Sequence, residues 1–188
     1  MKNRRSIRIL LVVALVAALI FPVYAYMVHI SQTVANEFTP ANVTCKIVEE
    51  FDGENKTSIA VKNTSNIDAY IRVQLSFHWQ DSKGNVVARV PKDGEPAFPP
   101  KVEYDGNWKA MGNYIYCYKL PVKPGESTGN LLKLDEKISM TPVVITTTDG
   151  TKYTYYPVVE VLAEAIQSLP VTAVEGAWGV TIKEGSIQ

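Results

Sequence analysis

The chain has 188 residues, with 19 Lys and Arg against 19 Asp and Glu, so its formal net charge at pH 7 is zero. Four of the cations stand at the very start: Lys2, Arg4, Arg5 and Arg8. The rest of the chain is therefore mildly acidic. A mildly acidic domain without a basic cluster argues against nucleic acid as a partner, because phosphate binding needs concentrated Lys and Arg.

The N-terminal segment has the order of parts of a secretory signal. Its basic start is followed by an apolar run over residues 9–21, then by Pro22 and a small residue, Ala25, ahead of Tyr26. This order predicts a signal peptide with a hydrophobic helix over residues 1–25, cleaved between Ala25 and Tyr26. We expect the basic start to stay in the cytoplasm and the remainder to be exported, which leaves one ordinary domain.

An uncleaved membrane anchor is the alternative for the same segment. Tyr26, Met27 and Val28 prolong the apolar run toward the ~20 residues that a bilayer requires. In that case the membrane would be contacted only through this uncleaved segment, and the exported domain would stay anchored at the cell surface.

Residues 26–42 predict an N-terminal arm ahead of the first strand. Val28 and Ile30 alternate with Met27 and His29, so the arm can present an apolar row while its main chain pairs with an open sheet edge of another copy. The candidate assembly residues are Tyr26, Met27, Val28, His29, Ile30 and Phe38. The alternative is a flexible leader or a membrane-proximal stalk.

From Val43 onward the chain reads as short strands separated by turn residues, which predicts one domain over residues 43–188. The clearest strand is 69–80, where Ile71, Val73 and Leu75 alternate with polar residues. Further strands are predicted over 114–120, 142–148, 151–156 and 178–183, with a Pro- and Gly-rich loop over 89–107 and a hairpin turn at Asp149-Gly150.

One segment is ambiguous from its pattern alone. In residues 158–167 the apolar positions fit a helix stripe and a strand alternation equally well. The many strands and turns nevertheless indicate an all-β protein, an antiparallel β-sandwich such as a jelly roll.

The two cysteines, Cys45 and Cys117, each alternate with apolar neighbours. An exported protein can keep a disulfide, so a bridge between them and two buried thiols are both open. Two cysteines with His29 and His78 do not build a structural zinc site at any standard spacing. We expect no metal and no cofactor.

Aromatic residues offer a candidate binding face. Tyr114, Tyr116 and Tyr118 alternate along one predicted strand, with Tyr104 and Trp108 in the loop before it. Such a row can stack on cell-wall glycan or pack against a protein partner. The favoured alternative is that the tyrosines fill the core of the sandwich or cover one sheet. Nucleophile elbows, phosphate loops and Cys-His nucleophile pairs do not occur in the sequence, so we expect no catalytic residues and no enzyme.

Several stretches together resemble a known family. They are Ala25-Tyr26, the stretch 35–39 (Ala-Asn-Glu-Phe-Thr), the strand 43–50 with Phe51-Asp52-Gly53, the stretches 61–72 and 112–116, Pro124-Gly125-Glu126, and 159–167 followed by Ala177-Trp178-Gly179. In order and spacing they resemble the exported TasA/camelysin-like proteins of Gram-positive bacteria, in particular the clostridial type described as biofilm matrix proteins that the SipW signal peptidase processes. The resemblance covers nearly the whole chain.

The resemblance implies a jelly-roll domain in which residues 158–167 form a strand. It also implies cleavage near Ala25 by a SipW-like signal peptidase, an extracellular or cell-surface location in the biofilm matrix, and donation of the freed arm as a strand to the next subunit of a fibre. Partners would then be other copies or other matrix proteins. Some relatives are described as metalloproteases, but His29 and His78 lack the helical spacing and intervening glutamate of a zinc peptidase. A monomeric binding module for wall glycan or a protein partner is the alternative function.

Overall fold

The computed structural model of the chain describes residues 42–188, which belong to one compact unit. Antiparallel strands and one short helix make up this part of the chain, so the prediction of an all-β protein is confirmed. The predicted signal peptide with its hydrophobic helix, the cleavage site at Ala25 and Tyr26, and the candidate assembly residues of the arm lie outside the described residues.

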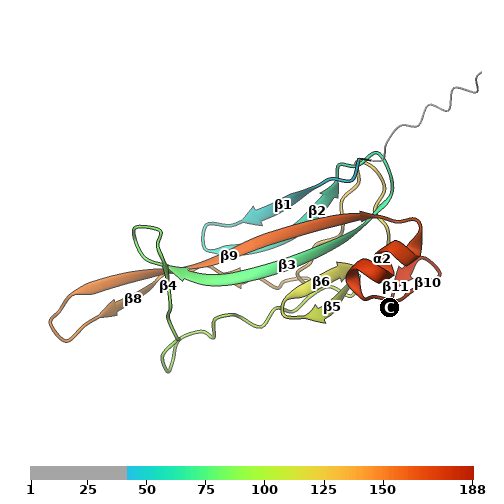
Figure 1. Cartoon of the computed structure of the whole chain (residues 1–188). Helices are drawn as coiled ribbons and strands as arrows, with labels where there is room; N and C mark the ends of the chain where they lie inside the picture. The colour runs from blue at the N-terminus through green and yellow to red at the C-terminus, as the bar shows by residue number, and fades with distance from the viewer. Residues whose placement is uncertain (1–41) are drawn as a thin grey trace, which may run out of the picture. The chain divides into compact units, whose positions relative to one another are not determined.

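Figure 1 shows the order of the elements along the chain. The strands are β1 (Cys45–Phe51), β2 (Asn55–Asn63), β3 (Ala69–Gln80), β4 (Val86–Val87), β5 (Trp108–Gly112), β6 (Ile115–Tyr118), β7 (Ile138–Ser139), β8 (Val143–Thr146), β9 (Lys152–Gln167), β10 (Ile182–Lys183) and β11 (Ser186–Ile187), and helix α2 (Val171–Trp178) follows β9.

The longest ladder pairs β3 with β9 along the whole of β3. The register runs from Ala69 opposite Gln167 to Gln80 opposite Tyr156 without a bulge. The predicted bounds of the strand 69–80 are confirmed. The ambiguous segment 158–167 is a strand because its backbone groups pair with β3, a non-local interaction that no pattern within the segment reveals.

Two sheets share the main core. One has the strand order β5-β6-β3-β9-β8, with β4 paired to β3, and the other has the order β1-β2-β7. Inward-facing side chains of both sheets meet in one buried cluster: Ile59, Val61, Ile71, Val73, Leu75, Val102, Trp108, Tyr116, Val122, Leu131, Leu132, Ile138 and Val159. Most of these are aliphatic or aromatic residues on alternating strand positions, as expected for strands with one buried face.

A smaller cluster lies against the opposite face of the larger sheet. Tyr70 and Cys117 point to this face and pack with Val174 of α2, Val180 and Ile187. Arg72 pairs with Glu164 of β9 and lies 5.0 Å from the centroid of the Trp178 ring. The helix and the β10–β11 hairpin therefore cover one end of this face.

The C-terminal prediction was partly wrong. Residues 178–183 were expected to form a closing strand, but α2 extends through Trp178 and ends at Gly179, whose φ of 64° is left-handed. Glycine adopts that conformation without steric cost and commonly ends helices. Only Ile182 and Lys183 are extended, as β10.

Two predictions about connections are confirmed. Asp149 and Gly150 lie in the turn between β8 and β9, where the Asp149 side chain accepts a hydrogen bond from the Thr151 N–H at 3.1 Å. Residues 89–107 contain no strand. The buried Arg89 side chain organises this loop, since it pairs with Glu95 and lies against the Trp79 ring, 4.6 Å from its centroid.

We predict that Ile71→Ala lowers the free energy of unfolding by about 2–5 kcal/mol, because it leaves a cavity at a fully buried position. Val90→Ala, at a position that is 83% exposed, should change it by less than about 0.5 kcal/mol. Urea unfolding followed by tryptophan fluorescence measures both. A similar small change for the two variants would contradict the assigned core.

Candidate functional site: an open seam between two strand edges

The outer edge of β9 is open over most of its length. In an antiparallel strand the N–H and C=O of one residue point to the same side, and those of its neighbours to the other. The Val159 carbonyl accepts a hydrogen bond from Lys56 Nζ at 3.3 Å, on the side away from β3. Val161, Ala163 and Ala165 share that side. On it β8 pairs only with Lys152–Tyr155, and no other described strand continues the ladder.

The outer edge of β1 is open as well. On β2, the N–H groups of Ile59 and Val61 donate to Asn130 Oδ1 and Thr128 Oγ1, on the side away from β1. The residues of β2 that face β1 are thus the even-numbered ones, which stand opposite even-numbered residues of β1. By the same alternation, Cys45, Ile47 and Glu49 direct their N–H and C=O groups outward. Within residues 42–188 no strand pairs with this edge.

These two edges lie beside each other, although β1 and β9 belong to different sheets. The inward-facing side chains of residues 43–47 and of β9 from Val161 to Ala165 are only half-buried, in contrast to the fully buried Ile59 and Ile71 of the same core. We call this region the β1–β9 seam and define it by Val43, Cys45, Ile47, Val161, Ala163 and Ala165. The seam combines unpaired main-chain groups with a partly exposed apolar row, which are the two features that an added strand would use.

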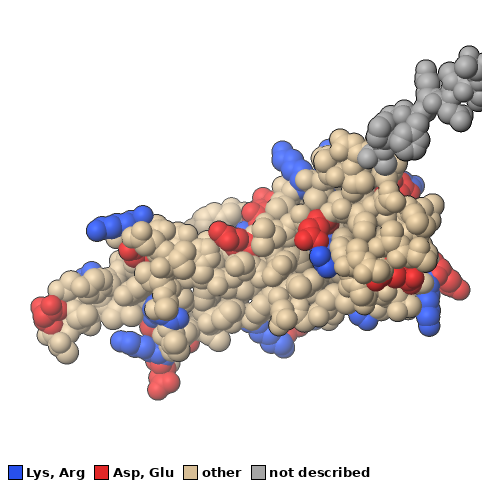
Figure 2. All heavy atoms as spheres, viewed as in Figure 1, with Lys and Arg blue, Asp and Glu red and all other residues tan. Residues whose placement is uncertain are grey.

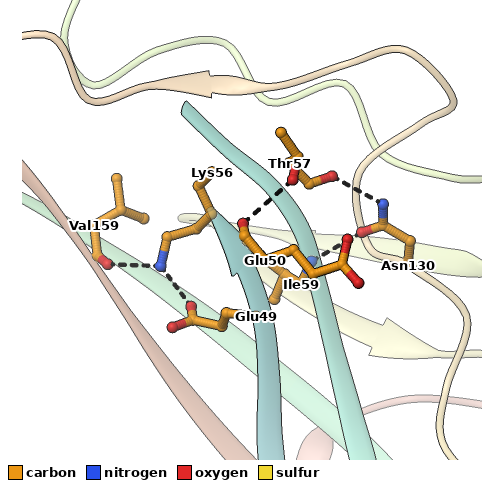
Figure 3. A network of polar contacts seen from close by, with 7 residues as sticks. All are labelled: Glu49, Glu50, Lys56, Thr57, Ile59, Asn130 and Val159. Carbon is orange, nitrogen blue, oxygen red and sulfur yellow. Dashed lines mark hydrogen bonds and ion pairs between the residues drawn. The ribbon is translucent and has the colours of Figure 1, made fainter. Parts of the chain in front are cut away.

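One end of the seam is closed by an ion pair between a buried lysine and a more exposed glutamate (Figure 3). Lys56 of β2 is 8% exposed, and its Nζ donates to Glu49 Oε1 at 2.5 Å as well as to the Val159 carbonyl. The pair thus connects the β1–β2 sheet to β9 across the seam. Neither Lys56 nor Glu49 was among the site residues predicted from the sequence. The available signal was Glu49, which interrupts the apolar alternation of Val43, Cys45 and Ile47.

On the edge of β2 that faces away from β1, Asn130 bonds to the main chain of the strand, as Figure 3 also shows. Asn130 Oδ1 accepts the Ile59 N–H at 2.9 Å, and Asn130 Nδ2 donates to the Thr57 carbonyl at 3.2 Å. Residues 124–132 therefore satisfy the inner edge of β2 and leave β1 as the outermost strand of its sheet.

The chain enters the described unit at the other end of the seam. The Asn42 N–H donates to Asn66 Oδ1 at 3.1 Å, and the Thr44 N–H donates to Ser65 Oγ at 2.9 Å. These contacts attach the start of β1 to the turn after β2. The predicted arm, residues 26–42, thus joins the domain beside the end of the seam that has no ion pair.

The candidate disulfide between Cys45 and Cys117 is not formed, and both thiols are free. Cys45 packs against the core between the two sheets, whereas Cys117 belongs to the cluster under α2 on the opposite face of the larger sheet. The main chain of that sheet separates them. The alternation pattern correctly predicted that each cysteine lies on an apolar face. It did not indicate which of the two buried clusters each cysteine joins.

The prediction of an aromatic binding face needs correction, because most of its residues pack in or against the core. Trp108 is 1% and Tyr116 5% exposed, and Tyr118 packs against the Trp108 ring at a centroid separation of 5.1 Å. Tyr114 lies in the β5–β6 turn, with its ring 4.7 Å from that of Phe77. Only Tyr104 is exposed, over Tyr116. Tyr116 fills the interior, and Tyr114 and Tyr118 are half-buried against it, which leaves little of the row for a glycan to contact.

A small pocket of about 140 Å³ lies elsewhere, at the far end of β3 and β9. Its walls are mainly apolar and include Trp79, Phe98 and Pro157, with Glu95 and Thr141 among the polar lining residues. The indole N–H of Trp79 is buried and has no hydrogen-bond partner. The hydrogen bond from Arg89 lowers the pKa of Glu95, so that this carboxylate stays ionised to more acidic pH than usual.

Charges of both signs are interspersed over the face seen in Figure 2. Among residues 42–188, no set of three or more His, Cys, Asp and Glu side chains is grouped as a metal site would require. The helix in this part of the chain is too short to cross a bilayer. That the protein lacks a cofactor, a metal and nucleic-acid partners remains a prediction.

Comparisons with known proteins give no relative for this chain. No family model, curated protein or solved structure matches it.

We predict that iodoacetamide modifies Cys45 faster than Cys117 in the folded protein. Cys117 is fully buried, while Cys45 is half-buried in the seam. Burial raises the pKa of both thiols, that of Cys117 to about 11, and the thiolate is the reactive form. Peptide mass spectrometry after timed alkylation gives the two rates, with urea-unfolded protein as the control in which they converge. Equal rates in the folded protein, or an intact bridge without reductant, would contradict this structure.

The same burial predicts a pH dependence of stability. Because the pKa of Cys117 rises to about 11 on folding from a usual value near 9, its contribution is fully present below pH 9 and is lost as pH rises toward 11, by on the order of 2–3 kcal/mol. Urea unfolding between pH 8 and pH 11 should therefore show a shallower decline for Cys117→Ala than for the unaltered chain. Identical slopes would show that the thiol titrates alike in both states.

Proposed function

We propose that this protein is an exported structural subunit of the cell surface or biofilm matrix that assembles by accepting a strand from another copy at the β1–β9 seam. The observation that carries the proposal is the pair of adjacent open edges. One edge offers Cys45 and Ile47, and the other offers Val161, Ala163 and Ala165, with their main-chain groups free among the described residues.

The donated strand in this proposal is the arm of a second copy, from Tyr26 to Phe38. Its alternation at Met27, Val28, His29 and Ile30 suits a strand with one apolar side. Cleavage after Ala25, by a SipW-like signal peptidase, would free the arm. A jelly-roll topology, completed by the added strand, is part of the same proposal, as are the TasA/camelysin-like kinship and the extracellular location.

The energetics favour a long arm. About five main-chain hydrogen bonds contribute roughly 0.5–1.5 kcal/mol each, and two or three newly buried aliphatic side chains roughly 1.5–3 kcal/mol each. Association itself costs an estimated 4–15 kcal/mol. Because these magnitudes are comparable, assembly should depend on protein concentration and on the full length of the arm.

A monomeric binding module, free or anchored at the surface, is the second candidate function. With most of the tyrosine row packed inside, the pocket beside Trp79 is the observation that favours it, since the unpaired indole N–H of Trp79 would donate a hydrogen bond to a ligand oxygen. The protein would then bind a partner without forming fibres.

We predict filaments from residues 26–188 and none from a chain that begins at Pro40, because only the longer chain carries a strand to donate. Residues 42–188 contain both buried clusters, so the shorter chain should fold. Negative-stain electron microscopy across a wide concentration range measures the outcome. Cys45 should also become protected from alkylation in the filaments, since the added strand covers it.

A matched pair of substitutions tests the place of assembly. Ala163→Glu puts a charge into the seam and should abolish filaments, whereas Leu162→Glu, at a position that is 54% exposed on the outward face, should leave them intact. Monomers at every concentration from the unaltered 26–188 chain would remove strand donation and leave the binding module.

A further inference from the structure

The Lys56–Glu49 pair places a charged lysine side chain in a mostly buried position, which costs the hydration of that charge. Lys56 is 8% exposed and its side chain is inserted between β1 and β9. Burial removes most of the hydration of the Lys56 ammonium, while the Glu49 side chain stays 37% exposed. A lysine buried in this way is often no more stabilising than a well-packed apolar residue of the same volume. A contribution to stability is therefore a weak reason for this pair, and a contribution to specificity is the better one.

The position of the pair relates directly to strand register. A strand that pairs along the outer edge of β9 uses the main-chain groups of Val161, Ala163 and Ala165 in turn. At Val159 the carbonyl is already bonded to Lys56 Nζ. Across the seam, Glu49 replaces the apolar side chains that precede it at Cys45 and Ile47. Both rows of the seam thus end at the same ion pair.

Two kinds of register error are open to a strand that docks here. A slip of one residue turns every apolar side chain to the wrong face and is rejected by the core. A slip of two residues keeps the faces correct, so alternation does not reject it. A slip of this kind toward the ion pair would push the strand into Lys56 and Glu49, displace the acceptors of Nζ and leave the buried Lys56 ammonium without a partner.

From this geometry we infer that the Lys56–Glu49 pair is a register stop. It fixes where a strand from a second copy ends in the β1–β9 seam, and so sets one repeat between subunits. This inference rests on the proposed function. The seam admits the strand at the Val43 and Ala165 end, and the ion pair closes it at the Glu49 and Val159 end.

The test maps the register by disulfide cross-linking in chain 26–188. Cys117→Ala leaves Cys45 as the one thiol of residues 42–188, and single cysteines are then placed in turn along positions 26–38. In the otherwise unaltered chain we expect cross-links between copies at one dominant arm position. In Glu49→Leu/Lys56→Met, which replaces the ion pair with apolar groups, we expect comparable yields at positions two residues apart.

Two controls separate register from folding. Lys62→Met, at an exposed position of the same strand β2, should keep the single dominant position, and Lys56→Arg should retain it as well because the charge remains. Near-ultraviolet circular dichroism checks that each variant is folded. If the double variant fails to fold, Glu49→Gln replaces it, since it keeps an acceptor for Nζ, and a smaller spread of positions is expected.

The possible outcomes distinguish a failure of the register stop from a failure of the proposed strand donation. One unchanged cross-link position in the double variant, with filaments present, would overturn the register stop and leave strand donation standing. No cross-link between copies of the unaltered chain would overturn strand donation and the register stop together. Cross-links formed only within one chain would show that the arm fills its own seam, which also rejects assembly.

Discussion

The pairing of β3 with β9 is the constraint on which the rest of the described structure depends. It joins two long segments distant in sequence, from Ala69 opposite Gln167 to Gln80 opposite Tyr156. One face of this ribbon carries the core shared with β2, and the other carries α2 and the C-terminal hairpin. Because β6 and β4 take the free edge of β3, the long outer edge of β9 is what remains unsatisfied.

That open edge gives a physical reason for the ion pair between Lys56 and Glu49. A strand edge exposed beside an apolar row is prone to unspecific pairing, and inward-pointing charges are one way in which proteins limit it. Lys56 supplies such a charge, with Glu49 as its partner and the Val159 carbonyl as its second acceptor. The same three groups that protect the edge also leave the remainder of the seam accessible, so protection and selective pairing have one structural basis.

The two corrected site predictions have a common cause. A period of two shows that residues share a face, but it does not show which face meets water or which of two cores it joins. The alternation of Tyr116 and its neighbours, with Trp108 nearby, suggested a stacking surface. In the structure the facing sheet buries Tyr116 and Trp108. The sequence predicted apolar surroundings for both Cys45 and Cys117. In the structure these are two different clusters, and the larger sheet lies between them.

The sequence by itself determined the all-β class, the bounds of the strand 69–80, the turn at Asp149 and Gly150, and the strand-free loop over 89–107, because alternation and turn chemistry are local properties. For residues 158–167 the local pattern left helix and strand open, and the family resemblance implied a strand. Tertiary structure decided that they are extended, since their main-chain partners come from β3. It also decided the short α2 helix, whose stability comes from packing on Tyr70 and Cys117. The seam and its ion pair belong to the same category, because both arise where segments far apart in the chain leave two edges side by side.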